Sequence, residues 1–205
     1  MKKTIATGIV FLLVVLSFTA ISGIQIKNNI IMSSDRGDIL YVGGNGTVNY
    51  TTIQSAVDDA DWYDTVFVFD DGSPYNENVE VTKTITIIGE NKNTTIVNGY
   101  FEIRYKQVKL SGFTINSNTE YCVKIISSEN IISDNIINSE VVGIYIYADV
   151  YVGIFNNFIS NNIINSRGQG IMLYLAGFKG CNDNIITNNI ITSTEDKSGN
   201  GIKII

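Results

Sequence analysis

Residues 130–139 read Asn-Ile-Ile-Ser-Asp-Asn-Ile-Ile-Asn-Ser, and closely similar stretches return at 157–166 and again at 184–193. The spacing is 27 residues both times. A fixed period of this size is typical of proteins built from stacked supersecondary units, none of which can bury its apolar face alone. The repeat therefore restricts the architecture before any single residue is considered.

Each copy of the repeat is too interrupted to form a helix. Its Ile-Ile pairs are separated every few positions by Asn, Ser, Asp or Gly, and such short apolar runs suit strands joined by tight turns. A third apolar element follows the two pairs in each copy, at 143–147, 170–174 and 201–205. Three strands per coil predict an all-β, right-handed parallel β-helix.

Successive coils of a β-helix lie about 4.8 Å apart, so equivalent residues form columns along the stack. We expect one column of Asn130, Asn157 and Asn184, and a second of Asn135, Asn162 and Asn189. Asn suits such corners because it tolerates left-handed backbone and because stacked carboxamides hydrogen-bond to one another. We interpret these asparagines as structural.

The segment before the repeats carries a helix signal at residues 52–60. Thr51 and Gln54 match a capping box, with Thr51 as the N-cap. Apolar residues recur at helical spacing in this segment: Ile53, Ala56, Val57 and Ala60. We expect this helix to cover the open first coil. Short strands with a period near 22 residues should follow it, before the 27-residue coils begin at about residue 130.

The N-terminus is typical of an exported protein. Lys2 and Lys3 precede an apolar run at 9–16, so residues 1–22 are predicted to be a signal peptide, or an N-terminal membrane anchor if they are not cleaved. Residues 23–38 would be a linker, and 39–205 the β-helix domain. The predicted location is extracellular or at the cell surface.

The sequence stops inside an expected strand, at Ile205. An uncovered last coil presents an open strand edge, which favours pairing with another chain. We therefore expect either that this chain is a truncated part of a longer β-helix, or that it self-associates through its C-terminal coil.

Composition narrows the classes of partner. The chain has 14 Lys and Arg against 20 Asp and Glu, a net charge of −6, which disfavours nucleic acid and anionic membrane surfaces. Cys122 and Cys181 occupy non-equivalent coil positions, so we interpret both as packing residues rather than a disulfide. Three sequons mark candidate glycosylation sites at Asn45, Asn49 and Asn93.

The N-terminal coils resemble a known superfamily. Tyr-Thr-Thr-Ile-Gln-Ser-Ala-Val at 50–57, with the strands at 65–68 and 85–88, is similar to the first coils of the pectate lyase-like superfamily, which includes pectin methylesterases. The Asn-x-Ile coils resemble those of surface and periplasmic β-helix proteins, among them the NosD-like family. The resemblance covers about residues 39–205. It implies the fold but not an activity, because this superfamily includes lyases, hydrolases, esterases, epimerases and scaffolds.

Catalytic motifs of these relatives are missing from the sequence. It has no Gln-Asp-Thr or Gly-Arg-Pro-Trp segment of the pectin methylesterase type, and without histidine it has no polygalacturonase or alginate epimerase element. Arg167, the one arginine of the middle coils, has no acidic pair at equivalent positions. Trp62 follows the expected helix, where packing in the core or cap is its expected role.

No cofactor is expected either. Copper binding, which the NosD-like resemblance would suggest, requires soft or imidazole ligands that this chain lacks. Calcium would accept the oxygens of an acidic group, but these residues show no regular ligand spacing and are expected to lie in solvated turns: Asp58, Asp59, Asp61, Asp64, Asp70 and Asp71.

The remaining candidate for a ligand site is a row of outward side chains. If Ile144 and Ile146 point into the core, the alternating residues point outward and align with those one period later: Tyr145 and Tyr147 with Met172 and Tyr174. Exposed tyrosines on a rigid sheet suit stacking of sugar rings or docking of a protein. Cross-strand packing alone is the alternative explanation.

The sequence therefore predicts an exported, non-catalytic module, either a cell-surface structural element or a scaffold that binds carbohydrate or protein. The alternative is a polysaccharide-active enzyme of lyase or hydrolase type, with missing or degenerate catalytic coils. A groove in which two carboxylates and a basic residue converge would favour the enzyme.

Overall fold

The computed structural model describes residues 37–149, 153–176, 180–194 and 199–205. The expected signal peptide or anchor at 1–22, and nearly all of the expected linker at 23–38, lie outside the described residues. Within the described ranges, no helix is long and apolar enough to cross a membrane.

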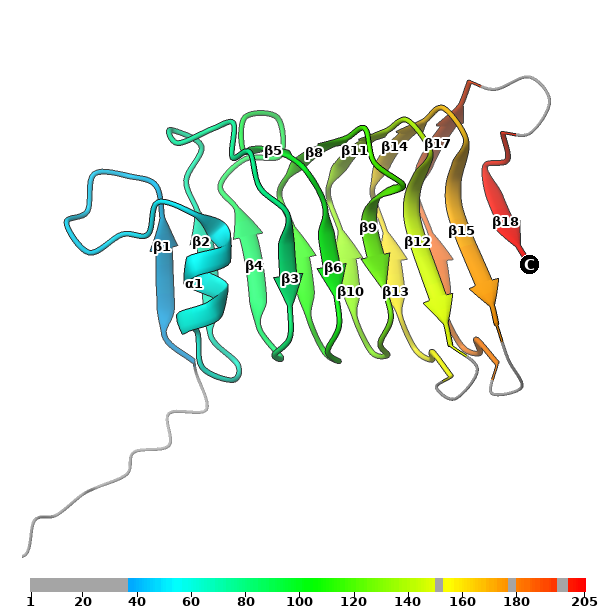
Figure 1. Cartoon of the computed structure of the whole chain (residues 1–205), viewed down its shortest axis with the longest axis horizontal. Helices are drawn as coiled ribbons and strands as arrows, with labels where there is room; N and C mark the ends of the chain where they lie inside the picture. Colours follow the sequence, from blue (N-terminus) through cyan, green and yellow to red (C-terminus); the bar gives the residue numbers. More distant parts are fainter. Residues whose placement is uncertain (1–36, 150–152, 177–179, 195–198) are drawn as a thin grey trace, which may run out of the picture. The chain divides into compact units, whose positions relative to one another are not determined.

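The described residues form a parallel β-solenoid with three strands per coil, stacked from β1 at one end to β18 at the other (Figure 1). Sheet A contains β1 (Ile39–Val42), β2 (Thr65–Val68), β4 (Thr86–Gly89), β7 (Lys109–Ser111), β10 (Ile131–Ser133), β13 (Phe158–Ser160) and β16 (Ile185–Thr187). Sheet B contains β5 (Ile96–Asn98), β8 (Thr114–Ser117), β11 (Ile136–Ser139), β14 (Ile163–Ser166) and β17 (Ile190–Ser193). Sheet C contains β3 (Val79–Val81), β6 (Phe101–Ile103), β9 (Tyr121–Ile125), β12 (Val142–Ala148), β15 (Gln169–Leu175) and β18 (Ile202–Ile204).

The strand register confirms the predicted periods. Ile131 pairs with Phe158, and Phe158 pairs with Ile185, which are steps of 27 residues. In the other direction Ile131 pairs with Lys109, a step of 22 residues. The coil length therefore changes inside one continuous stack.

The longer coils also have longer strands in sheet C. The strands β12 and β15 have seven residues each, whereas β9 has five. The added residues extend the C-terminal ends of β12 and β15, where Tyr147 and Tyr174 lie side by side. The change of period thus creates the second outward column of sheet C.

Branched apolar side chains fill the interior. In sheet A the inward column is fully buried and consists of Val66, Ile87, Leu110, Ile132 and Ile159. Sheets B and C supply similar columns, so every coil contributes to one continuous core. Burying each such side chain stabilises the fold by roughly 1.5–3 kcal/mol.

The inward positions of the last coil are less well covered. Ile204 pairs with the buried Leu173, yet 69% of Ile204 is exposed. The strands β16, β17 and β18 are the outermost strands of their sheets. The expected self-association through this coil stays a prediction.

A short helix, α1 (Ile53–Asp59), precedes β2 and packs against β1, β2 and β3. It buries Ile53, Ala56 and Val57, in agreement with the spacing of apolar residues in the sequence. The role expected for it as a cover over the first coil stays a prediction.

The predicted capping box of α1 is wrong. The N-cap is Thr52 rather than Thr51, and its side chain accepts a hydrogen bond from the backbone N of Ser55. The carboxylate of Glu77 accepts the N–H groups of Ile53 and Gln54, both at 2.9 Å. An acidic group at a helix N-terminus satisfies unpaired donors and opposes the helix dipole, and here it comes from a neighbouring coil.

The reason given for asparagine at the corners also needs correction. The left-handed residues are those directly before the column asparagines: Glu129, Asp134, Asn156, Asn161, Asp183 and Asn188, with φ between 54° and 65°. Asn and Asp tolerate this conformation better than most residues. The asparagines of the two predicted columns are therefore selected by hydrogen bonding rather than by their own backbone.

Candidate functional site

The two predicted Asn columns form buried hydrogen-bonded ladders. In the first, the Nδ2 of Asn130 donates to the Oδ1 of Asn157, and Asn157 donates to Asn184, both at 2.9 Å. The Oδ1 of Asn157 also accepts the backbone N of Asn130 at 2.9 Å. The second column repeats this arrangement with Asn135, Asn162 and Asn189. Side chains engaged in this way hold the corners of the coils and are not available to a ligand.

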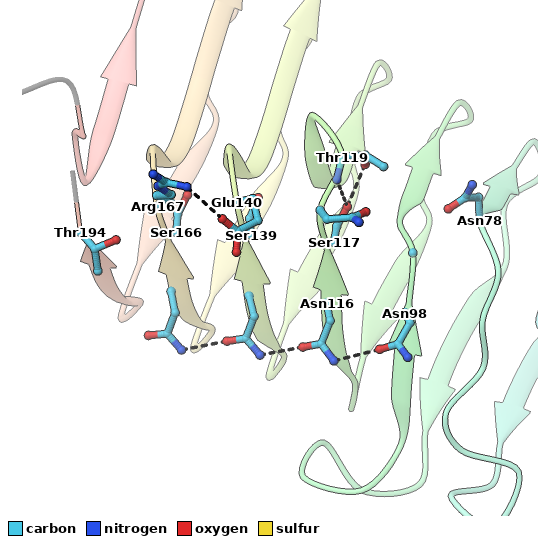
Figure 2. Close-up of a pocket in the computed structure, with 14 residues that line it drawn as sticks. Asn78, Asn98, Asn116, Ser117, Thr119, Ser139, Glu140, Ser166, Arg167 and Thr194 are labelled. Atoms are coloured by element: carbon cyan, nitrogen blue, oxygen red, sulfur yellow. Dashed lines mark hydrogen bonds and ion pairs between the residues drawn. The ribbon is translucent and has the colours of Figure 1, made fainter.

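A third Asn ladder, which sequence reasoning missed, lies on the outer face of sheet B (Figure 2). Its members are Asn76, Asn98, Asn116, Asn138 and Asn165. Each Nδ2 donates to the Oδ1 of the preceding coil, over 2.8–3.1 Å. The row is longer than either buried ladder and faces outward.

Strand alternation sets the outward direction of this ladder. In β8, β11 and β14 the residue before each Asn is a fully buried isoleucine: Ile115, Ile137 and Ile164. The following Asn must therefore point to the opposite face of the sheet. Parallel in-register pairing then brings the carboxamides within hydrogen-bond distance.

The ladder lines an open groove of about 760 Å³ over sheet B. The groove also contains residues from the turns between sheets B and C: Asn118, Thr119, Glu140, Arg167 and Thr194 (Figure 2). Because it crosses several coils, the groove runs along the stack rather than across one strand. This shape suits an extended polymer.

The ladder leaves hydrogen-bonding capacity at every coil. A carboxamide has two N–H donors and two oxygen lone pairs, and each inner member of the ladder uses one of each. The remaining N–H and lone pair suit a hydroxyl group, which both donates and accepts. The neighbouring serine hydroxyls are already used, since Ser139 and Ser166 donate to the backbone oxygens of Val142 and Val141.

The charges in the groove offset each other. The Nη1 of Arg167 lies 3.7 Å from the Oε2 of Glu140, which belongs to the neighbouring coil. Both side chains are mostly exposed, so this ion pair contributes little to stability. The groove as a whole is polar and close to neutral.

The four residues predicted as a ligand platform do lie together on the outer face of sheet C: Tyr145, Tyr147, Met172 and Tyr174. All four are half-buried, while Ile144 and Ile146 are fully buried on the opposite face. Burial, followed by the charge of Glu120 and the neighbouring tyrosines, raises the pKa of the Tyr145 phenol. Their role in binding stays a prediction.

The rings of this platform pack on one another. Tyr147 and Tyr174 are stacked, with centroids 5.6 Å apart and planes within 8° of parallel. Tyr145 lies against Tyr147 at 5.8 Å and 56°. An offset stack covers part of each ring face, which reduces the flat area left for a sugar ring. Cross-strand packing therefore accounts for much of this arrangement.

A cluster of charged side chains continues the outer face of sheet C from the platform toward β3. Glu102, which is 6% exposed, lies 3.2 Å from Arg104 and 3.7 Å from Lys124 and accepts a hydrogen bond from the Tyr121 hydroxyl at 3.3 Å. Arg104 also pairs with Glu80 at 3.3 Å. Burial, and then the charge of Glu102, raises the pKa of Tyr121. Extending the column of Tyr145 and Lys124 to earlier coils would have indicated this cluster.

The acidic group near α1 is dispersed among structural roles. Asp64, for example, accepts the backbone N–H groups of Asp38 and Asp61, each at 2.7 Å. Asp58 accepts from the Gln54 side chain. In the part of the chain that the structure describes, no three His, Cys, Asp or Glu side chains are grouped so that they could hold a metal ion.

The two cysteines are both free. Cys122 is fully buried, and burial raises the pKa of its thiol to about 12. Cys181 is half-buried, and burial raises its pKa as well, while a hydrogen bond from Asn184 opposes that rise. Both therefore behave as packing residues at neutral pH, as the sequence indicated.

Two further sequence interpretations concern the surface. Trp62 is 48% exposed and packs edge-on against Tyr105, with centroids 4.8 Å apart, so its expected place in the core is wrong. Of the sequon asparagines, Asn45 and Asn93 are exposed, whereas Asn49 donates to the backbone oxygen of Gly43 within its own loop. Glycosylation at these three positions stays a prediction.

Comparison with protein-family models, with curated proteins and with solved structures finds no match to this chain.

Proposed function

We propose that this chain is an exported, non-catalytic module that binds a neutral polysaccharide along the groove of sheet B. The observation that carries the proposal is the exposed ladder that runs from Asn76 to Asn165. It supplies the same donor and acceptor pair at every coil, about 4.8 Å apart along the stack. A polymer with regularly placed hydroxyl groups is the ligand that such a row suits.

The ladder reduces the entropic cost of binding. Each carboxamide is already oriented by its neighbours, for example Asn138 by Asn116 and Asn165. A ligand then does not have to order these side chains itself, which favours affinity. Hydrogen bonds in such a chain also polarise one another in the same direction.

Isoleucines beside the ladder complement the sugar chemistry. The second outward column of sheet B contains Ile136 and Ile163, both half-buried, and Ile190, which is exposed. Sugar rings combine apolar C–H faces with polar rims, so a surface with an apolar column next to a carboxamide column matches both parts.

Charge favours a neutral glycan over an acidic one. The chain carries a net charge of −6, and the Arg167 guanidinium in the groove is paired with Glu140. A polyanion such as polygalacturonate or alginate would approach against this field. The proposed ligand class is therefore a neutral glycan, which the resemblance to pectate lyase-like proteins by itself would not have suggested.

Affinity electrophoresis or calorimetry of the full chain tests this proposal, with neutral xylan, glucan and mannan against polygalacturonate and alginate. We expect saturable binding of at least one neutral polymer. The double variant N116A/N138A should weaken that binding at least about tenfold, through loss of adjacent hydrogen-bonding groups. The control N93A/N182A removes two exposed asparagines outside the groove and should leave binding unchanged.

Two results would contradict the groove assignment. One is equal loss of binding in the groove variant and its control. The other is a preference for the polyanions.

A polysaccharide-active enzyme is the second candidate, and the Glu102 cluster is the observation in its favour. Two carboxylates and two basic side chains converge there beside Tyr121. Incubation with neutral and acidic polysaccharides, followed by assay for unsaturated products and reducing ends, tests this alternative. Product formation that E102Q abolishes would favour the enzyme over the binding module.

A further inference from the structure

A second hollow lies near the N-terminal end of the stack, between the loop that follows β1 and the end of β2 (Figure 1). Its volume is about 480 Å³. The rings of Tyr41 and Phe69 line it together with the acidic side chains of Asp70, Asp71 and Glu90. This hollow, called the β1 pocket below, is separate from the groove of sheet B.

Aromatic side chains form one wall of the β1 pocket. Tyr41 and Phe69 are stacked with centroids 5.8 Å apart and planes 23° from parallel, and Phe67 packs edge-on against both. Tyr41 is 40% exposed. The faces of aromatic rings carry partial negative charge, so a group of three rings at a surface attracts a cation.

The loop of the β1 pocket is held in place by specific contacts. Gly44 has a left-handed backbone with φ of 72°, and a Cβ at this position would lie 2.7 Å from the ring of Phe69. Only glycine allows the loop to pass so close to that ring. The Gly44 N–H donates to the Oδ1 of Asp71 at 2.8 Å, which ties the loop to the turn after β2.

Negative charge surrounds the mouth of the pocket. In the described ranges, Asp70, Asp71 and Glu90 take part in no ion pair. The buried Tyr75 beneath the pocket responds to this field, since burial, followed by the charges of Asp71, Glu77, Asp70 and Glu90, raises its pKa to about 12. The pocket thus combines aromatic faces with three carboxylates.

We propose that the β1 pocket binds the alkylated ammonium group of a small organic cation. The charge of such a group is spread over methyl groups that are weakly hydrated, so aromatic faces stabilise it well. The surrounding carboxylates add attraction at a distance without having to coordinate the ion. A volume of about 480 Å³ admits an ammonium group with a short chain attached.

Calorimetry or NMR titration of the full chain, produced in a host that does not glycosylate the sequons, tests the proposal at constant ionic strength. The probes are choline, tetramethylammonium and the neutral isostere 3,3-dimethylbutan-1-ol. We expect saturable binding of both cations and at least about tenfold weaker binding of the isostere, which has the same shape but no charge.

Variants separate the two parts of the pocket. D71N/E90Q removes two charges but keeps the oxygens that accept the N–H groups of Gly44 and Asp70, and should weaken choline binding about tenfold. Y41L should abolish it, and Y41F should retain it. The control D58N/E129Q removes two remote charges and should leave choline binding unchanged, while circular dichroism confirms that each variant is folded.

Three outcomes would overturn the proposal: equal binding of choline and its isostere, choline binding that D71N/E90Q leaves unchanged, or absence of saturable binding. A calcium titration provides a further check. Calcium binding that D71N/E90Q removes, without choline binding, would assign the carboxylates to a metal ion instead. None of these results depends on the groove of sheet B, so the proposed glycan binding stands or falls separately.

Discussion

Asn138 donates a hydrogen bond from its Nδ2 to the Oδ1 of Asn116 over 2.8 Å, which joins two coils on the outer face of sheet B. Asn162, in a buried corner, donates to Asn189 over 3.0 Å with the same chemistry. The two asparagines differ in their surroundings. That difference allows structural ladders to be distinguished from a ligand-binding one by stability alone.

The variant N162A should destabilise the protein strongly, by about 2–4 kcal/mol in the free energy of unfolding. It would leave the backbone N–H of Asn135 and the backbone oxygen of Ile132 without their side-chain partner inside the protein. N138A should cost less than about 1 kcal/mol, because water can replace its partners. Urea unfolding measures both values. Equal costs would contradict the division into structural and exposed ladders.

Truncation of the tyrosine platform should affect stability but not glycan binding. Y147A removes the stack with Tyr174 and should lower the free energy of unfolding by about 1 kcal/mol or more. If the groove of sheet B is the binding site, the affinity of Y147A for the neutral glycan should equal that of the unmodified chain. A large loss of affinity with the fold intact would move the binding site to sheet C.

The buried carboxylate of Glu102 should matter more than that of Glu80. E102Q reduces the attraction for both Arg104 and Lys124 in a site with little water, and should cost about 1–3 kcal/mol. The Glu80 side chain is half exposed, so E80Q should cost less than about 1 kcal/mol. Thermal or urea unfolding of the two variants compares them directly. A larger effect for E80Q would contradict the assigned burial.

Alkylation should distinguish the two cysteines. At pH 8 iodoacetamide should modify Cys181 before Cys122, because the thiolate is the reactive form and Cys122 is both fully buried and the holder of a pKa near 12. Mass spectrometry of peptides after timed labelling measures the order. Rapid labelling of Cys122 in the folded protein would show that its coil opens locally.

The same thiol gives a pH dependence. The folded-state pKa of Cys122 lies above its usual value of 9.0, so its contribution to stability is complete below pH 9 and is lost as the pH rises toward about 12. The variant C122A removes this titration. Its free energy of unfolding should therefore fall less steeply over that range than that of the unmodified chain.

Several features could be predicted from the chain alone. The 27-residue period indicated the strands, the inward isoleucines and both buried Asn columns, because in-register stacking repeats each environment at a constant interval. The outward placement of Tyr145 and Tyr147 followed from strand alternation. These are local or periodic properties, and the sequence contains them directly.

The exposed Asn ladder could not be predicted in this way. Its steps are 22, 18, 22 and 27 residues long, so no single period connects Asn76 to Asn165. Only the register of β5, β8, β11 and β14 aligns the side chains. The Glu102 cluster similarly joins residues from three coils of unequal length.

The sequence by itself determined that this chain stacks short strands around an isoleucine core, because periodic burial of apolar side chains requires nothing beyond the repeat. The tertiary structure decided which polar residues meet. Glu77 at the N-terminus of α1, the carboxamide row in the groove and the rings beside Asp71 in the β1 pocket each come from segments far apart in the chain. Their distances depend on loop lengths and register, which are set only when all coils pack together.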